Sequence, residues 1–149
     1  MNDLTELYQE MILEHGRNPR NFNINNQASH QHRGFNPICG DEITLYLDID
    51  ANNHITHLSF DGKGCAICMA STSLLTEKLL GCSVTEAKRL FAQFKCLVTE
   101  GNVTDDIALG KLTIFSGVRQ FPMRIKCATL AWHTMMAALE GKQQLSTTE

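Results

Sequence analysis

The chain has 149 residues, of which 43% are hydrophobic and 19% are charged, and its formal net charge is −3. These values predict one ordinary globular domain over residues 1–149, long enough to bury about two-thirds of the surface that its unfolded chain exposes. The negative charge argues against nucleic acid as a partner, because phosphate binding requires a concentrated basic face. Since no apolar run approaches the roughly 20 residues that span a bilayer, a membrane partner is not expected either.

The start of the chain and its cysteines bear on the cellular compartment. The first six residues include Asp3 and Glu6 and carry neither the basic start nor the apolar core of a signal peptide. We therefore predict a cytoplasmic protein. In a reducing compartment, the six cysteines are expected to be free thiols, metal ligands or catalytic groups rather than disulfides.

The N-terminal region, residues 1–38, is predicted to be a helix followed by a loop. Over residues 3–15, apolar side chains recur at the three- and four-residue spacing of one helix face, and Gly16 follows as a favourable end. Residues 17–32 are rich in turn formers and poor in apolar side chains, which predicts a loop. Histidines in this region are interpreted as solvated side chains rather than ligands: His15, His30 and His32.

Two β-strands are predicted next. Residues 43–49 and 55–60 alternate apolar and polar side chains, which is typical of half-buried strands. The polar stretch 50–53 between them predicts a turn, so the two strands form an antiparallel hairpin. The second strand runs into a bend with two glycines at 61–64, directly before Cys65.

Helices are predicted for most of the second half. Residues 66–80 form a helix of small and apolar residues, the Ser-Val-Thr-Glu motif at 83–86 is a capping box for the next, and a short helix is expected over 105–111. The last helix covers 122–141 and opens with proline, and the polar tail 143–149 is expected to fray. Strands followed by helices predict an α+β fold, in which helices cover one face of a small antiparallel sheet.

Three cysteines stand at transitions between these elements. Cys39 lies in the loop before the first predicted strand, Cys65 in the glycine-containing bend, and Cys127 near the start of the last helix. Asp41 points to the same side as Cys39 if the segment between them is extended. Three thiolates and a carboxylate would make a closed tetrahedral zinc site. The spacing alone leaves this convergence a hypothesis.

Such a site would carry a net charge of −2, which is costly to remove from water without compensation. Basic side chains near the proposed ligands are candidates for balancing this charge, although an ordinary solvated position is the more common outcome for any one of them: Lys63, Arg119, Arg124 and Lys126.

Cys68 follows Cys65 by three residues and completes a Cys-X-X-Cys pattern. This pattern is typical of a thioredoxin-like redox motif or of an additional metal ligand. Because no βαβ pattern surrounds it, we discount the redox interpretation. Cys82 and Cys96 are interpreted as structural or incidental.

Four segments together resemble the IscU/NifU-N family of iron–sulfur cluster assembly proteins. They are Leu7-Tyr8 with Ile12, His15 and Pro19-Arg20-Asn21; Asn36-Pro37-Ile38-Cys39-Gly40-Asp41; Gly62-Lys63-Gly64-Cys65-Ala66-Ile67; and Arg124-Ile125-Lys126-Cys127-Ala128-Thr129-Leu130-Ala131-Trp132. The resemblance covers nearly the whole chain and all four proposed ligands. It implies the family fold (SufE/NifU-like or IscU-like), a small antiparallel sheet covered by helices, in line with the layout above.

Two features resemble the SufU-like branch of this family. Lys126 precedes Cys127 where scaffold members carry a histidine ligand, and region 82–121 resembles the insertion of SufU-like proteins. One residue departs from the pattern: Cys68 stands where SufU-like proteins usually have serine, so it is either an alternative ligand or a site of adventitious oxidation. The resemblance implies zinc bound by Cys39, Asp41, Cys65 and Cys127.

The same resemblance implies a function. The chain is expected to be a zinc-dependent sulfur acceptor that takes persulfide sulfur from a SufS-type cysteine desulfurase onto Cys39 and passes it to a downstream cluster-assembly scaffold. In this sulfurtransferase-type role it acts with the desulfurase and not as an independent catalyst. The first alternative is a scaffold that assembles a transient [2Fe–2S] cluster on the same ligands, against which Lys126 counts. The second is a purely structural zinc module.

Overall fold

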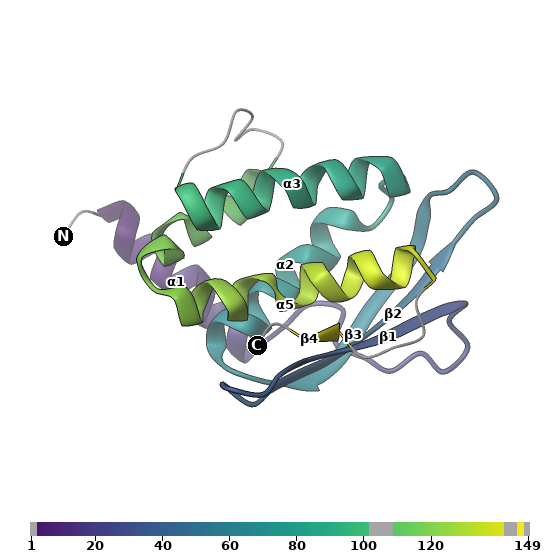
Figure 1. Cartoon of the computed structure of the whole chain (residues 1–149), viewed down its shortest axis with the longest axis horizontal. Helices are drawn as coiled ribbons and strands as arrows, with labels where there is room; N and C mark the ends of the chain where they lie inside the picture. Colours follow the sequence, from purple (N-terminus) through teal and green to yellow (C-terminus); the bar gives the residue numbers. More distant parts are fainter. Residues whose placement is uncertain (1–2, 102–108, 142–145, 148–149) are drawn as a thin grey trace.

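The computed structural model describes residues 3–101, 109–141 and 146–147. Figure 1 shows two layers, with the sheet along one side of the molecule and the helices stacked over one of its faces. This arrangement confirms the predicted α+β fold. In the ranges that the structure describes, no helix has both the length and the apolar character needed to cross a membrane.

The helices of the described ranges follow the predicted order. They are α1 (Asp3–Arg17), α2 (Ala66–Leu79), α3 (Val84–Glu100), the 3₁₀ helix η1 (Gly110–Gln120) and α5 (Pro122–Leu139). At the predicted capping box, the Ser83 hydroxyl accepts a hydrogen bond from Glu86 N at 3.1 Å. The short helix predicted over 105–111 falls largely outside the described residues.

The sheet contains more than the predicted hairpin. Its strands are β1 (His30–Asn36), β2 (Asp41–Ile49), β3 (Ile55–Lys63) and β4 (Ser146–Thr147). They lie in the order β3-β2-β1-β4, with β2 antiparallel to both β1 and β3, and β4 parallel to β1. The predicted hairpin is thus confirmed as β2 and β3, both longer than expected.

Two segments that were expected to be irregular belong to this sheet. Residues 30–36 were predicted to be loop and form β1, and residues 146–147, in the tail predicted to fray, pair with it as β4. The inward positions of β1 are His32, Gly34 and Asn36, so the apolar alternation that marks a strand is absent. Gly34 lets α5 approach closely, because a Cβ there would collide with a side chain of that helix.

The core lies between the inner face of the sheet and the helices α2 and α5. Region 82–121, resembling an insertion, contributes α3 and η1, which pack into the same core through aromatic side chains. Trp132 of α5 stacks on Phe94 of α3 with ring centroids 4.9 Å apart, and Phe94 meets Phe115 of η1 at 5.9 Å. This packing fixes α5 and therefore the position of Cys127.

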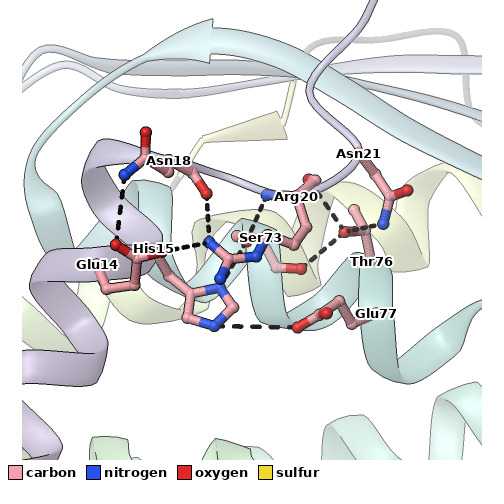
Figure 2. A network of polar contacts seen from close by, with 8 residues as sticks. All are labelled: Glu14, His15, Asn18, Arg20, Asn21, Ser73, Thr76 and Glu77. Carbon is pink, nitrogen blue, oxygen red and sulfur yellow. Dashed lines mark hydrogen bonds and ion pairs between the residues drawn. The ribbon is translucent and has the colours of Figure 1, made fainter.

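A polar network joins the end of α1 to α2, and Figure 2 shows its side chains from close by. His15 Nδ1 and Arg20 N both contact the Ser73 hydroxyl at 2.8 Å, and Asn21 Nδ2 donates to Thr76 Oγ1 at 3.0 Å. Burial lowers the pKa of His15 below its ordinary value. The network holds the predicted N-terminal helix against the helix that begins after Cys65.

The solvated interpretation of the histidines was wrong for two of the three. His15 is 4% exposed and His32 is 3% exposed, whereas His30 is half-buried. His15 sits on the inner side of α1, against Ser73, and His32 occupies an inward position of the missed strand β1. Without that strand, nothing in the sequence indicated that a histidine in a polar stretch would face the core.

Candidate metal centre

The first part of the site is the turn that joins β1 to β2. Gly40 N donates to the Asn36 carbonyl at 2.9 Å, and Gly40 has a φ of 74°, which glycine adopts at little cost. Cys39 lies exposed in this turn, whereas Asp41 opens β2 and is fully buried. The extended geometry that was the condition for Cys39 and Asp41 to share a side is not found in this turn. The reversal at Gly40 replaces it.

The second part is the start of α2. Cys65 is the N-cap of this helix, and its Sγ accepts a hydrogen bond from Cys68 N at 3.4 Å. Cys65 N donates to Asp41 Oδ1 at 2.9 Å, and Cys65 Sγ lies 4.0 Å from Asp41 Oδ2. Gly64 leaves room for this carboxylate, because an added Cβ would lie 2.7 Å from Asp41 Oδ1. The bend before α2 and the start of β2 are thus linked directly.

The third part is Cys127, in the second turn of α5 and 4% exposed. Its thiol donates to Cys39 Sγ at 3.5 Å. One potential ligand atom from each of Cys39, Asp41 and Cys127 lies within 4.8 Å of the other two. The structure therefore brings together the side chains that the sequence analysis proposed as ligands, with Cys65 joined to them through its contacts with Asp41.

The thiols of Cys65 and Cys127 shift each other's pKa in opposite directions. A hydrogen bond from Cys127 lowers the pKa of Cys65 to about 7, helped by the Cys68 N–H, and the same bond raises the pKa of Cys127. The lowered pKa favours the thiolate of Cys65, and thiolate is the form that binds a metal.

The donor set fits a zinc ion. Tetrahedral zinc with ligands at about 2.0–2.3 Å places neighbouring donor atoms roughly 3.3–3.8 Å apart. The Cys39–Cys127 sulfur distance of 3.5 Å lies in this range, and the Cys65–Asp41 separation of 4.0 Å is close to it. Three thiolates are also ligands that iron–sulfur clusters use.

The groups that contact these donor atoms are neutral. Cys65 N and Cys68 N donate to Asp41 and to Cys65, and Asn36 Nδ2 donates to Cys127 Sγ at 3.9 Å. The basic residues predicted to balance the charge lie farther out in the solvent layer: Lys63 and Arg124 are exposed, and Lys126 is half-buried. Their charge-balancing role stays a prediction.

The remaining cysteines behave differently from the proposed ligands. Cys68 is fully buried one turn into α2, and burial raises the pKa of its thiol. Its role as an alternative ligand stays a prediction. Cys82 and Cys96 make local contacts with residues four positions away, Lys78 O at 3.3 Å and Glu100 Oε2 at 3.4 Å, in line with their structural interpretation.

The sequence analysis assigned no role to Asn36, although it quoted the residue as part of a motif. The side chain is fully buried beside Cys127. Recognising it required strand β1, because an Asn at the end of a loop has no defined direction, whereas the last residue of a strand does.

A groove of about 490 Å³ opens beside the site, between α1, η1 and the first turn of α5. Ile67 and Arg124 line it, and they are close in sequence to Cys65 and Cys127. Arg124 lies over the Phe121 ring, 4.3 Å from its centroid. The groove is thus lined mainly by apolar side chains, with a cationic edge at Arg124.

Known proteins share both the sequence and this architecture. The chain is 35% identical over 133 residues to the zinc-dependent sulfurtransferase SufU of Bacillus subtilis, covering 89% of each chain. It is 34% identical to the iron–sulfur cluster assembly scaffold protein IscU of Thermotoga maritima, covering 90% of this chain and 93% of that one. A crystal structure from Fervidobacterium islandicum, described as a putative iron–sulfur cluster assembly scaffold protein for the SUF system, matches with a TM-score of 0.83 and 33% identity, covering 90% and 97% of the two chains.

Residues 7–128 match the family described as the NifU-like N-terminal domain. This range contains β1 to β3, α2 and every proposed ligand from Cys39 to Cys127. The family resemblance seen in the sequence is thereby confirmed. The chain belongs to the NifU-like N-terminal domain family, which is also called the IscU/NifU family.

Proposed function

We propose that this protein is a zinc-dependent sulfur acceptor in iron–sulfur cluster assembly, and that Cys39 receives the sulfur. One observation carries the proposal: a single exposed thiol, Cys39, lies 3.5 Å from the sulfur of a buried cysteine within a metal-competent cluster. The 35% identity to a protein named as a zinc-dependent sulfurtransferase supports it. Lys126, where scaffold members of the family carry histidine, points in the same direction.

Cys39, Asp41, Cys65 and Cys127 would hold the zinc ion. When bound, zinc keeps its cysteine ligands deprotonated at neutral pH and so keeps a nucleophilic thiolate available. Three of these residues are fixed by the fold, since Asp41 lies on β2, Cys65 caps α2 and Cys127 lies within α5. Cys39 lies on the exposed turn and is the residue that can leave the site with the least disturbance.

The chemistry of the acceptor step follows from the thiolate of Cys39. The desulfurase presents a cysteine persulfide, and Cys39 Sγ attacks its outer sulfur. A new S–S bond forms on Cys39 while the S–S bond of the donor breaks, and the donor cysteine leaves as a thiolate. The proton of the donor persulfide stays with the transferred sulfur, so the step needs no oxidant or reductant.

The surface around Cys39 suits a protein that delivers a buried persulfide. Ile38, Phe121 and Met123 are 59%, 45% and 38% exposed, and the groove beside the site is lined mainly by apolar side chains. Exposed aromatic and aliphatic side chains of this kind are typical anchors at protein interfaces, where partner binding removes them from water. Arg124 and Lys63 add positive charge near the incoming persulfide. We propose a SufS-type cysteine desulfurase as the partner and a downstream cluster-assembly scaffold as the recipient.

A second candidate is a scaffold that holds a transient [2Fe–2S] cluster as cargo. The clustered thiols of Cys39 and Cys127 favour it, and so does the 34% identity to a protein named as a cluster assembly scaffold. A purely structural zinc module is the third. It predicts that Cys39 matters for stability alone.

The test measures metal content and the turnover of a purified cysteine desulfurase with and without this protein. We expect the wild type to contain about one zinc per chain and to stimulate turnover. Cys39→Ser should abolish the stimulation while the protein stays folded, and Cys96→Ser, which changes a thiol on α3 outside the site, should behave as the wild type.

Three results separate the candidates. The leading proposal would be wrong if the wild type contained no zinc, or if Cys39→Ser still stimulated desulfurase turnover fully. Appearance of iron–sulfur absorption on the isolated protein after incubation with iron and desulfurase would favour the scaffold. Loss of stability in Cys39→Ser, with no stimulation by the wild type, would favour the structural module.

A further inference from the structure

Asn36 is the last residue of β1, and its side chain is fully buried beside the candidate metal centre. Its Nδ2 donates to Cys127 Sγ across 3.9 Å. Its main-chain carbonyl oxygen accepts a hydrogen bond from the Gly40 N–H at 2.9 Å, and this bond closes the turn that carries Cys39. One residue therefore contacts both the buried sulfur on α5 and the backbone of the exposed turn.

The register of the sheet strengthens this placement. Asn36 and Asp41 are Cα partners, the last pair of the ladder between β1 and β2 before the turn. Asp41 in turn accepts the Cys65 N–H. A side chain at position 36 thus faces the point where β2, α2 and α5 deliver their proposed ligands.

Folding alone does not explain a buried amide here. Among the described residues, Asn36 Oδ1 has no hydrogen-bond partner, and an unpaired buried acceptor destabilises the folded state. An apolar side chain of similar shape would avoid that penalty, yet it would offer no N–H to Cys127. The contribution of the amide must therefore lie in the contact of its N–H with the sulfur.

We propose that Asn36 is a positioning residue for the metal centre, whose amide N–H orients the Cys127 sulfur toward the other ligands and withdraws charge from it. The metal-binding consequence rests on the proposed function, whereas the contact itself does not. Groups that hydrogen-bond to metal ligands typically change metal affinity by about 10- to 100-fold. By holding Cys127, Asn36 would keep the buried ligands in place while the Cys39 turn moves.

The first test compares two isosteric variants. Asn36→Asp replaces the N–H donor by an oxygen, and Asn21→Asp makes the same change at an amide that donates to Thr76 at 3.0 Å, in the α1–α2 network. Asn36→Leu removes the donor without adding charge. For each protein, zinc affinity is measured by competition with a chelator, and the sulfur-to-metal charge-transfer band is recorded after cobalt substitution.

We expect both Asn36 variants to bind zinc about 10- to 100-fold more weakly and to shift the charge-transfer band to lower energy, because the sulfur becomes more electron-rich. Asn21→Asp should leave both quantities unchanged. A merely structural role of Asn36 would lower stability without moving the band. Unchanged affinity and an unmoved band in both Asn36 variants would overturn the proposal.

A second measurement uses the metal-free protein and needs no variant of Asn36. The side-chain amide protons of Asn36 are observed by NMR in the wild type and in Cys127→Ala. We expect one of the two protons to exchange slowly with solvent and to change its chemical shift when the sulfur is removed. Unchanged chemical shifts of both protons in Cys127→Ala would overturn the contact. Failure of the wild type to bind zinc or cobalt would instead reject the proposed function, and this measurement would still decide the role of Asn36.

Discussion

The two halves of the candidate metal centre are held by the fold in different ways. Asp41, Cys65 and Cys127 are on regular elements and are linked through their own hydrogen bonds. Cys39 lies exposed on a turn of four residues between β1 and β2, closed by Gly40. This contrast supports the proposal that one half of the site retains a metal while the other presents a nucleophile.

The largest difference is expected between Asp41→Ala and Cys39→Ser. Removing the carboxylate leaves the Cys65 N–H without its acceptor, at a cost of about 1–3 kcal/mol, and also deletes a proposed buried ligand. In Asp41→Ala, zinc affinity should fall by more than the factor of about 10 to 100 that is typical when a group hydrogen-bonded to a ligand is lost. In Cys39→Ser, the loss of zinc affinity should be smaller. Competition titration with a chelator measures both. Equal losses in the two variants would contradict the division into two halves.

Removal of zinc should lower the stability of the whole domain. A ligand present at 100 times its Kd stabilises the folded state by about 2.7 kcal/mol, which corresponds to roughly 5–11 °C in Tm for a domain of this size. Calorimetry with and without a chelator measures the shift. If the buried half holds the metal, Cys39→Ser should retain most of this Tm shift. Loss of the entire shift in this variant would place Cys39 among the holding residues.

Gly64→Ala tests the buried half without touching a ligand. The added Cβ would lie 2.7 Å from Asp41 Oδ1, so the carboxylate must move, at a cost of about 1–3 kcal/mol. The matched control is Gly117→Ala, since a Cβ at that position meets nothing within 4 Å. We expect weaker zinc binding and lower stability in Gly64→Ala alone. Identical zinc affinities of the two variants would show that Asp41 need not be fixed.

The smallest effect is expected at the α1–α2 network, outside the centre. Because burial lowers the pKa of His15, the unfolded chain binds more protons than the folded one as the pH falls below the ordinary histidine range. Stability from this residue is therefore full above the unfolded pKa and is lost as the pH falls through the folded one. Chelator-treated His15→Gln should show a flatter dependence of unfolding free energy on pH between about 7.5 and 5. The exposed His54→Gln serves as control, and an unchanged slope in His15→Gln would contradict this account.

Much of the fold could be predicted because its signals are local. The alternation of 43–49 and 55–60 predicted β2 and β3, and the capping box at 83–86 predicted the start of α3. Strand β1 could not be predicted, since its inward residues are a histidine, a glycine and an asparagine whose burial depends on the close approach of α5.

The candidate site shows the same limit. Its cysteines and Asp41 were proposed from their places at element boundaries and from the family resemblance, and the structure brings them together. Cys39 and Asp41 come together as proposed, although a turn with a positive φ at Gly40 stands in place of the extended segment. The role of Asn36 could not be predicted for a related reason. The face toward which its side chain points is defined only once strand β1 is known.

The most direct test of the central claim locates the transferred sulfur. The zinc-loaded protein is mixed with a cysteine desulfurase and L-cysteine for a single turnover, alkylated, digested and examined by mass spectrometry. We predict that the additional sulfur is found on the peptide that contains Cys39, with Cys65 and Cys127 unmodified. Sulfur on Cys65 or Cys127 ahead of Cys39, or on none of the three, would contradict the division between a holding half and an accepting half.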